Sequence, residues 1–265
     1  MAWEQSDALH MGAMTHLAAG DMAGARRMAL ARRELPFFRQ SDHLAVPWLI
    51  ATAAMAGDLD EALDMAGRFR QSWIEAGRPT TGGIGMAPAA AAMALGLRGD
   101  EATRAEWIAI VAEMRRVVIA LVGPRTGYGE LFDGVVALHH GDLATAMARL
   151  AEPPESYVRW YDGAWRQWYA AVWAELAVVA GRPDRRDRLA RATAIAAGNP
   201  VASAMVTRAV ALDASDTDLL LAAAAALDEA GCPYQRARTL ILAGGDARVT
   251  GEAILTSIGA APMST

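Results

Sequence analysis

Long apolar stretches alternate along this chain with short breaks that contain Gly, Pro or Asp. Within the stretches the apolar residues recur at helical spacing, and β-branched residues never alternate with polar ones over a useful length. The pattern therefore predicts an all-α fold without strands. We expect about seven antiparallel helical hairpins, or some fourteen helices, between residue 2 and about residue 258.

A Gly-Asp pair follows several of the apolar stretches and divides the chain into similar segments. The Asp residues stand at 21, 58, 100, 142 and, in a variant of the pair, 184, so the successive spacings are 37, 42, 42 and 42 residues. Gly can end a helix in the left-handed conformation, and Asp can cap the next helix by accepting from its free N–H groups. Each pair therefore predicts the tight elbow of a hairpin.

Other positions mark where helices begin. Glu61 stands three residues after Asp58, the spacing of a capping box. Pro200 and Pro233 fit the first position of a helix, and Pro47 indicates either the start of a helix or a kink. We expect a single helical-repeat domain over residues 1–265, with a soft boundary near residues 152–156, where two Pro residues adjoin.

The composition excludes several chemistries. Alanine supplies 61 of the 265 residues, or 23%, which favours helix. All 25 basic residues are Arg. Without Lys there can be no P-loop, no kinase of the usual kind and no Schiff base with pyridoxal phosphate.

Charge and hydropathy indicate a cytoplasmic protein that binds neither nucleic acid directly nor a membrane. The net charge is −5 and the isoelectric point is near 5.6, whereas nucleic-acid binders usually carry a basic surplus. The longest uncharged run, from Pro79 to Leu97, contains four Gly and two Pro and makes a poor membrane span. The N-terminus carries acid where a signal peptide carries basic residues. Cys232 is the single Cys, so no disulfide can form within the chain.

Several longer segments resemble a known group of helical repeats. These are Trp73–Pro79, Trp165–Glu175 and Gly231–Leu240. Together with the elbows, they are similar to the tetratricopeptide-like region of large bacterial signalling ATPases, which include LuxR-type regulators and adenylate or guanylate cyclases with an AAA-type ATPase module. The resemblance implies a right-handed α-solenoid that serves signal transduction or transcription regulation through a protein partner or another domain.

Aromatic residues are concentrated between Tyr157 and Trp173, where seven fall within seventeen residues. The segment is either a central helix buried between hairpins or an aromatic wall on the concave side of the solenoid. In the second interpretation two Arg side chains add an anion or carboxylate contact. The candidate binding residues are Arg159, Trp160, Arg166, Trp168, Tyr169 and Trp173. Glu175 falls on the apolar side and should find a donor as a structural pair.

No catalytic motif or metal spacing stands out, and we expect no cofactor. The leading hypothesis is therefore a non-enzymatic scaffold or regulatory module that binds a protein partner on its repeats. A second hypothesis is a sensor that binds a small-molecule effector on the Trp/Arg wall. A distant third is an all-α hydrolase with paired acids from separate hairpins.

Overall fold

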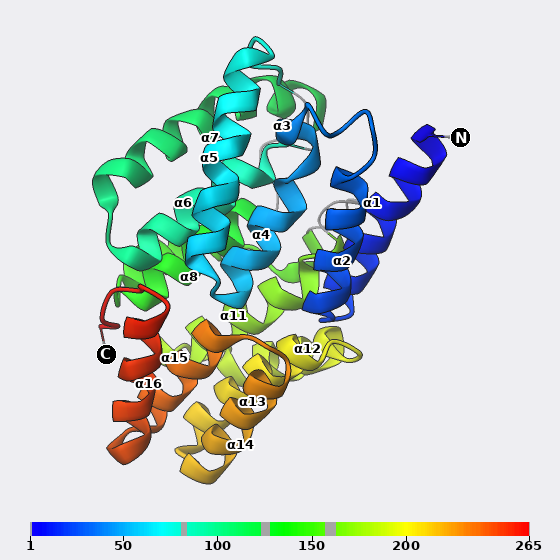
Figure 1. The fold of residues 1–265 in the computed structure, drawn as a ribbon. Helices are drawn as coiled ribbons and strands as arrows, with labels where there is room; N and C mark the ends of the chain where they lie inside the picture. The colour runs from blue at the N-terminus through cyan, green and yellow to red at the C-terminus, as the bar shows by residue number, and fades with distance from the viewer. Residues whose placement is uncertain (1, 81–83, 123–127, 157–162, 265) are drawn as a thin grey trace. The chain divides into compact units, whose positions relative to one another are not determined.

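In the computed structural model the chain folds into α-helices, and its described part contains no strand (Figure 1). The structure describes residues 2–80, 84–122, 128–156 and 163–264, with the backbone alone at 2–3 and 115–122. Helices account for 78% of the structure, which confirms the predicted all-α class. Contacts divide the chain into two compact units, residues 1–17 with 21–125 and residues 18–20 with 126–265. The soft boundary expected near 152–156 lies inside the second unit.

The first unit is built from paired helices. In chain order these are α1 (Ala2–Ala18), α2 (Met22–Arg33), α3 (Asp42–Ala45), α4 (Pro47–Ala56), α5 (Leu59–Glu75), α6 (Met86–Arg98) and α7 (Glu101–Val122). α4 packs on α5, α6 packs on α7, and α4 and α6 lie against each other. α5 also contacts α6, so the α4–α5 hairpin meets the next one through both of its helices.

The inner and outer helices of the first unit differ in their side chains. Every residue of α4 is buried, and so is every residue of α6 from Met86 to Leu97. Both are rich in Ala, whose small side chain lets helix backbones approach closely. α5 instead buries a single stripe, formed by Leu59, Ala62, Ala66, Phe69 and Trp73. This spacing is the amphipathic pattern of a helix that covers a core.

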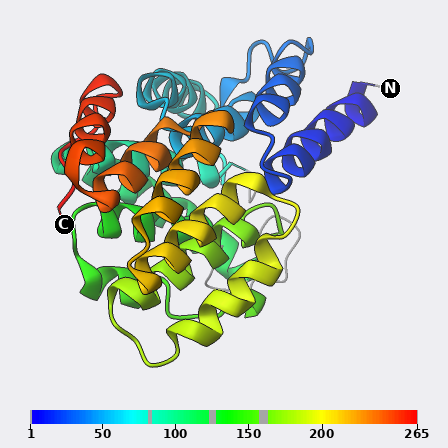
Figure 2. The same ribbon diagram turned by 90° about the horizontal axis from the view of Figure 1, so that it is seen from below.

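The second unit continues the pairing. Its helices are α8 (Tyr128–His139), α9 (Leu143–Arg149), the 3-10 turn η1 (Pro154–Ser156), α11 (Arg166–Val179), α12 (Arg185–Ala196), α13 (Pro200–Ala214), α14 (Thr217–Glu229), α15 (Pro233–Ala243) and α16 (Gly245–Ser257). α11 packs on α12, α13 on α14 and α15 on α16, while α11 also packs on α13. Figure 2 shows α12, α13 and α14 side by side.

The elbows adopt the backbone conformation that the Gly-Asp repeat predicts. Gly57, Gly99 and Gly141 have φ angles of 103°, 76° and 71°. A side chain in this left-handed region would bring its Cβ against the following carbonyl, which explains why Gly stands at the elbows. The predicted turns are therefore confirmed at these three positions.

Most elbow acids also cap the following helix. Asp100 Oδ1 accepts a hydrogen bond from Thr103 N at 3.1 Å, and Asp142 Oδ1 accepts one from Thr145 N at 3.0 Å. Hydrogen bonds from the side chains of Thr103 and Thr145, and then these backbone bonds, hold the pKa of both carboxyl groups below its ordinary value, because they stabilise the charged form. The predicted N-caps are confirmed at Asp100 and Asp142.

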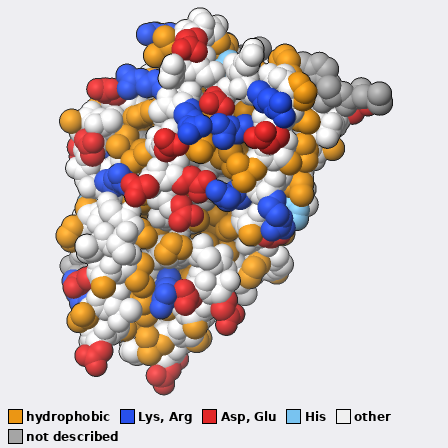
Figure 3. Space-filling view, viewed as in Figure 1, with side chains coloured by type: hydrophobic (Ala, Val, Ile, Leu, Met, Phe, Trp, Pro, Cys, Tyr) orange, Lys and Arg blue, Asp and Glu red, His pale blue; other side chains and the backbone are white. Residues whose placement is uncertain are grey.

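Asp58 and Asp184 are the exceptions, and the capping box predicted at Asp58 is wrong. Asp58 occupies the N-cap position of α5, but its side chain makes no capping hydrogen bond. Glu61 accepts instead from Arg26 Nη2 on α2, at 2.6 Å. Burial, followed by the nearby Glu61 charge, raises the pKa of Asp58. Arg26 thus pairs with Glu61, the acid on which the predicted capping box depended. Figure 3 shows side chains of opposite charge next to one another over α2 and α5.

Proline residues begin three helices. α13 and α15 start at Pro200 and Pro233, as predicted. α4 starts at Pro47, directly after the short α3 ends at Ala45, so Pro47 marks a start and not a kink. Proline suits the first position of a helix because an N–H group there, which Pro lacks, would have no acceptor within the helix.

The two kinds of elbow in the first unit give a matched test. Asp58→Ala should leave the free energy of unfolding within about 0.5 kcal/mol of the wild type, because no capping bond is lost. Asp100→Ala should lower the urea midpoint by more than Asp58→Ala does, since it removes the bond to Thr103 N. Equal losses in urea titrations followed by circular dichroism would contradict this difference.

Candidate functional site

The aromatic residues singled out from the sequence are packed inside the second unit wherever the structure describes them. Trp168, Tyr169 and Trp173 on α11 are 0%, 1% and 3% exposed. Arg159 and Trp160 lie outside the described residues. Arg166 is half-buried at the start of α11. The structure therefore places the three described aromatics in the core, where their rings have no face open to a partner.

α11 is the central helix of this unit. Each of its residues from Trp168 to Ala177 is buried, because α8, α12, α13 and η1 all pack around it. Trp165 just before it stacks edge-on against Phe132 of α8, with ring centroids 5.1 Å apart. The Tyr169 hydroxyl donates to Glu152 O at 2.8 Å. A helix that is apolar on all sides fits only in such a position.

Two Arg side chains of α12 cover Trp173. The guanidinium carbons of Arg188 and Arg191 lie 4.2 and 5.0 Å from the ring centroid, within the range of cation–π attraction. Arg188 Nε also lies 2.9 Å from Asp184 Oδ2, and Arg191 Nη2 lies 2.6 Å from Glu155 Oε2. Arg188 and Arg191 of α12 therefore already interact with neighbouring acids and with the Trp173 ring.

A buried ionic cluster joins α11, α13 and α15. Glu175, Arg208 and Arg238 are 0%, 0% and 3% exposed. Arg208 donates to Glu175 Oε2 from Nε at 3.0 Å and from Nη2 at 2.6 Å, and Arg238 Nη2 lies 2.6 Å from Glu175 Oε1. Arg208 Nη1 also donates to Gln235 Oε1 and Thr239 Oγ1, at 3.0 and 3.1 Å. We call Glu175, Arg208 and Arg238 the buried ionic cluster.

The cluster keeps its carboxylate ionised. Burial pushes the pKa of Glu175 upward, but the charges of Arg208 and Arg238 outweigh it, so the pKa falls below its ordinary value. Burial lowers the pKa of Arg208 for the same physical reason, since it disfavours a charged group. Glu175 has neither a proton to donate nor a path to solvent. Its chemistry is that of a structural ion pair, which agrees with the sequence expectation that it finds a donor.

Next to the cluster, the C-terminal residues pack back onto α8. His139 is fully buried, and its Nε2 lies 3.0 Å from Ala261 O, while Ser264 N donates to His139 O at 3.0 Å. On the other side of the ring, Nδ1 lies 3.4 Å from the Tyr234 hydroxyl of α15. These contacts fit a neutral ring that donates from Nε2 and accepts at Nδ1. α8, α15 and the tail thus pack together around His139.

Burial lowers the pKa of His139 to about 4, helped by the charges of His140 and Arg238. Burial also raises the pKa of Tyr234 to about 12. Both groups are therefore neutral at pH 7. Cys232 is fully buried as well, at the N-cap of α15. None of these three groups reaches a surface where a substrate could meet it.

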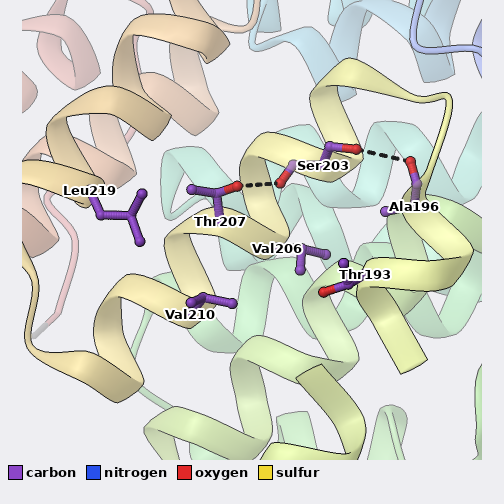
Figure 4. Close-up of a pocket in the computed structure, with 7 residues that line it drawn as sticks. All are labelled: Thr193, Ala196, Ser203, Val206, Thr207, Val210 and Leu219. Carbon is purple, nitrogen blue, oxygen red and sulfur yellow. Dashed lines mark hydrogen bonds between the residues drawn. The ribbon is translucent and has the colours of Figure 1, made fainter. Parts of the chain in front are cut away.

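An open feature of the second unit is a groove of about 300 Å³ over α13. Its floor is one stripe of α13, with α12 on one side and α14 on the other (Figure 4). The lining residues are Thr193, Ala196, Ser203, Val206, Thr207, Val210 and Leu219. We call this feature the α13 groove. Among the described residues, no charged side chain lines it.

The hydroxyl groups of the groove are held by the helices themselves. Thr193 Oγ1 donates to Leu189 O at 2.8 Å, Ser203 Oγ to Ala196 O at 3.0 Å, and Thr207 Oγ1 to Ser203 O at 3.0 Å. The groove therefore presents methyl groups and hydroxyl lone pairs, but no free hydroxyl proton. Such a surface suits apolar side chains and offers neither a nucleophile with a base nor a set of metal ligands.

The described residues contain neither a grouped set of metal ligands nor a membrane-spanning helix. Within residues 2–80, 84–122, 128–156 and 163–264, no three His, Cys, Asp or Glu side chains are grouped so that they could hold a metal ion. Among the helices of these ranges, none has the length and the apolar character needed to cross a bilayer. No family model, curated protein or solved structure that was compared with this chain matches it.

Sequence reasoning did not single out the α13 groove or the partners of Glu175. The residues 203, 206, 207 and 210 follow the i, i+3, i+4, i+7 spacing of a helix face, which was a readable signal. Arg208 was another, because it stands alone in the middle of an apolar helix. Neither signal says which face turns inward, so both needed the packed structure.

Replacing the buried acid should be far more costly than replacing an exposed one. Glu175→Gln leaves two buried Arg without a counter-charge and should lower the free energy of unfolding by about 3–5 kcal/mol. Glu155→Gln, which removes the partly exposed pair with Arg191, should cost about 0–1 kcal/mol. Urea titration of both variants measures the contrast, and similar costs would show that the cluster is not a structural ion pair.

Acid should weaken the second unit through His139. Its pKa is about 4 when folded against about 6.5 when unfolded, so the unfolded chain binds the proton first and stability falls as the pH drops from about 6.5 toward about 4. We expect the wild type to lose about 2 kcal/mol more than His139→Gln between about pH 7 and about pH 5. His10, whose pKa is also about 4, is present in both proteins and cancels. Parallel pH profiles of the two proteins in urea titrations would contradict the assignment.

Proposed function

We propose that this chain is a non-enzymatic helical-repeat module that binds a segment of a protein partner in the α13 groove. The observation that carries the proposal is the groove itself, a hollow of about 300 Å³ between two flanking helices, with Val210 exposed on its floor. Stacked helical hairpins commonly use such surfaces to hold other chains. The finer architecture that we propose is a right-handed, tetratricopeptide-like solenoid of about seven hairpins.

The chemistry of the groove supports binding over catalysis. Val206 and Val210 supply apolar contact, and every hydroxyl that lines the groove is already donating to a backbone carbonyl. An apolar floor with a few fixed acceptors fits the side chains of another protein. The buried ionic cluster and His139 are sealed inside the unit and support its shape instead.

The setting that we propose is signal transduction or transcription regulation in the cytoplasm of a bacterium. It rests on the resemblance of the repeats to those of LuxR-type regulators and cyclase-associated ATPases. In such a role the module relays an input by holding a partner or another domain. The Trp/Arg wall stays a prediction for an effector site, although Trp168, Tyr169 and Trp173 are buried.

A pair of matched variants tests the proposal. Val210→Arg places a charge on the groove floor, whereas Val249→Arg makes the same change at an exposed site on α16. We expect the wild type and Val249→Arg to enrich the same partner from a lysate of the source cells. Val210→Arg should retain about a tenth of it or less, as expected for loss of an interface centre.

Quantitative mass spectrometry of the captured proteins gives the readout, and circular dichroism confirms that both variants stay folded. The same partners on Val210→Arg as on the wild type would remove the groove from the proposal. No protein enriched over an unrelated control would count against protein binding altogether.

A further inference from the structure

The floor of the α13 groove has the length of a short helical contact. The stripe from Ser203 to Val210 spans seven residue steps along the axis of α13, a length of about 10 Å. A groove of about 300 Å³ has room for two or three apolar side chains, and residues at i, i+3 or i+4, and i+7 of a helix would reach along it. An amphipathic helix therefore matches the groove better than an extended strand, whose side chains alternate between faces.

The two ends of the groove differ in charge. Ala196 and Ser203 mark one end, which adjoins the α12–α13 elbow at residues 197–199, where no residue is charged. Val210 and Leu219 mark the other end, which adjoins the α13–α14 elbow. This elbow carries three acids, Asp213, Asp216 and Asp218.

Two of these three acids form no salt bridge within the part of the chain that the structure describes. Asp213 Oδ1 accepts from Arg185 Nε at 2.5 Å and is neutralised. Asp216 Oδ1 accepts from Leu219 N at 2.9 Å, which places this carboxylate directly beside a lining residue of the groove. Asp218 is exposed in the first turn of α14. α13 ends and α14 begins here, so their opposed dipoles offset each other and the two carboxylates set the local charge.

We infer that the α13 groove takes an amphipathic helix that carries Arg or Lys at the end lying over Asp216 and Asp218. The inference rests on the proposed function and specifies its partner. Apolar side chains of the incoming helix fill the floor, and the basic end fixes which way it runs. An acidic end at the same place would face two unneutralised carboxylates and be repelled.

Designed peptides can test the inference directly. The probe is a fluorescein-labelled peptide of about 15 residues, long enough to form a helix, with three Leu at the anchor spacing and two Arg at one end. A second peptide has Glu in place of both Arg, and a third has Ser in place of the Leu anchors. Fluorescence anisotropy with the full chain should show the Arg peptide binding about fivefold more tightly than the Glu peptide.

Two further measurements sharpen the result. The preference should shrink between about 50 mM and about 300 mM salt, because exposed charges are screened. Asp218→Arg should reverse the preference, whereas Asp246→Arg, the same change in the first turn of α16, should leave it intact. The Ser peptide should not bind measurably, and Val210→Arg should abolish binding of both Leu peptides.

The outcomes separate this inference from the proposed function. Equal binding of the Arg and Glu peptides, blocked by Val210→Arg, would keep the groove as a protein-binding site and overturn the basic partner. If no Leu peptide binds, while the lysate experiment still yields a partner that Val210→Arg loses, the helical partner is overturned and the groove remains a protein-binding site. A complex of two copies of this chain that Val210→Arg disrupts would replace the proposed partner with self-association.

Discussion

Glu175 is a carboxylate with no access to water, and the packing of the second unit depends on keeping it paired. Taking a charge out of water costs several kcal/mol even in a real protein interior, so it needs close and well-oriented partners. Arg208 lies 33 residues and Arg238 lies 63 residues after Glu175 in the chain, on two different helices. The pair of contacts sets how far α13 and α15 can slide or rotate against α11.

The same contacts decide what α13 shows to the outside. Arg208 points to the carboxylate, and at 100° per residue the stripe through Ser203, Val206, Thr207 and Val210 lies about 150° away from it. Rotating α13 to move the stripe inward would pull Arg208 out of its pair. The buried ionic cluster therefore holds the α13 groove open from the opposite side of the helix, although none of its members lines the groove.

Local signals in the sequence predicted much of the fold, and long-range contacts explain where they failed. The helix ends at Gly57, Gly99 and Gly141 were predictable because the left-handed conformation of a Gly depends on only a few neighbouring residues. The capping box at Asp58 does not form: Glu61 pairs with Arg26, 35 residues away in the chain, and the Asp58 N–H donates to Ala53 O. Periodicity identified the aromatic helix but could not say whether its rings faced the core or a ligand. Only the helices packed around α11 decide that, and they bury Trp168.

The single thiol of the chain lies one helical turn before a partner of the buried ionic cluster. Cys232 is fully buried at the N-cap of α15, three residues before Gln235, which accepts from Arg208. A thiol reagent can reach Cys232 only when the packing around the start of α15 opens, so its rate of modification reports how often such openings occur. The chain thereby carries its own kinetic probe of local opening beside the buried ionic cluster, and no label has to be introduced to read it.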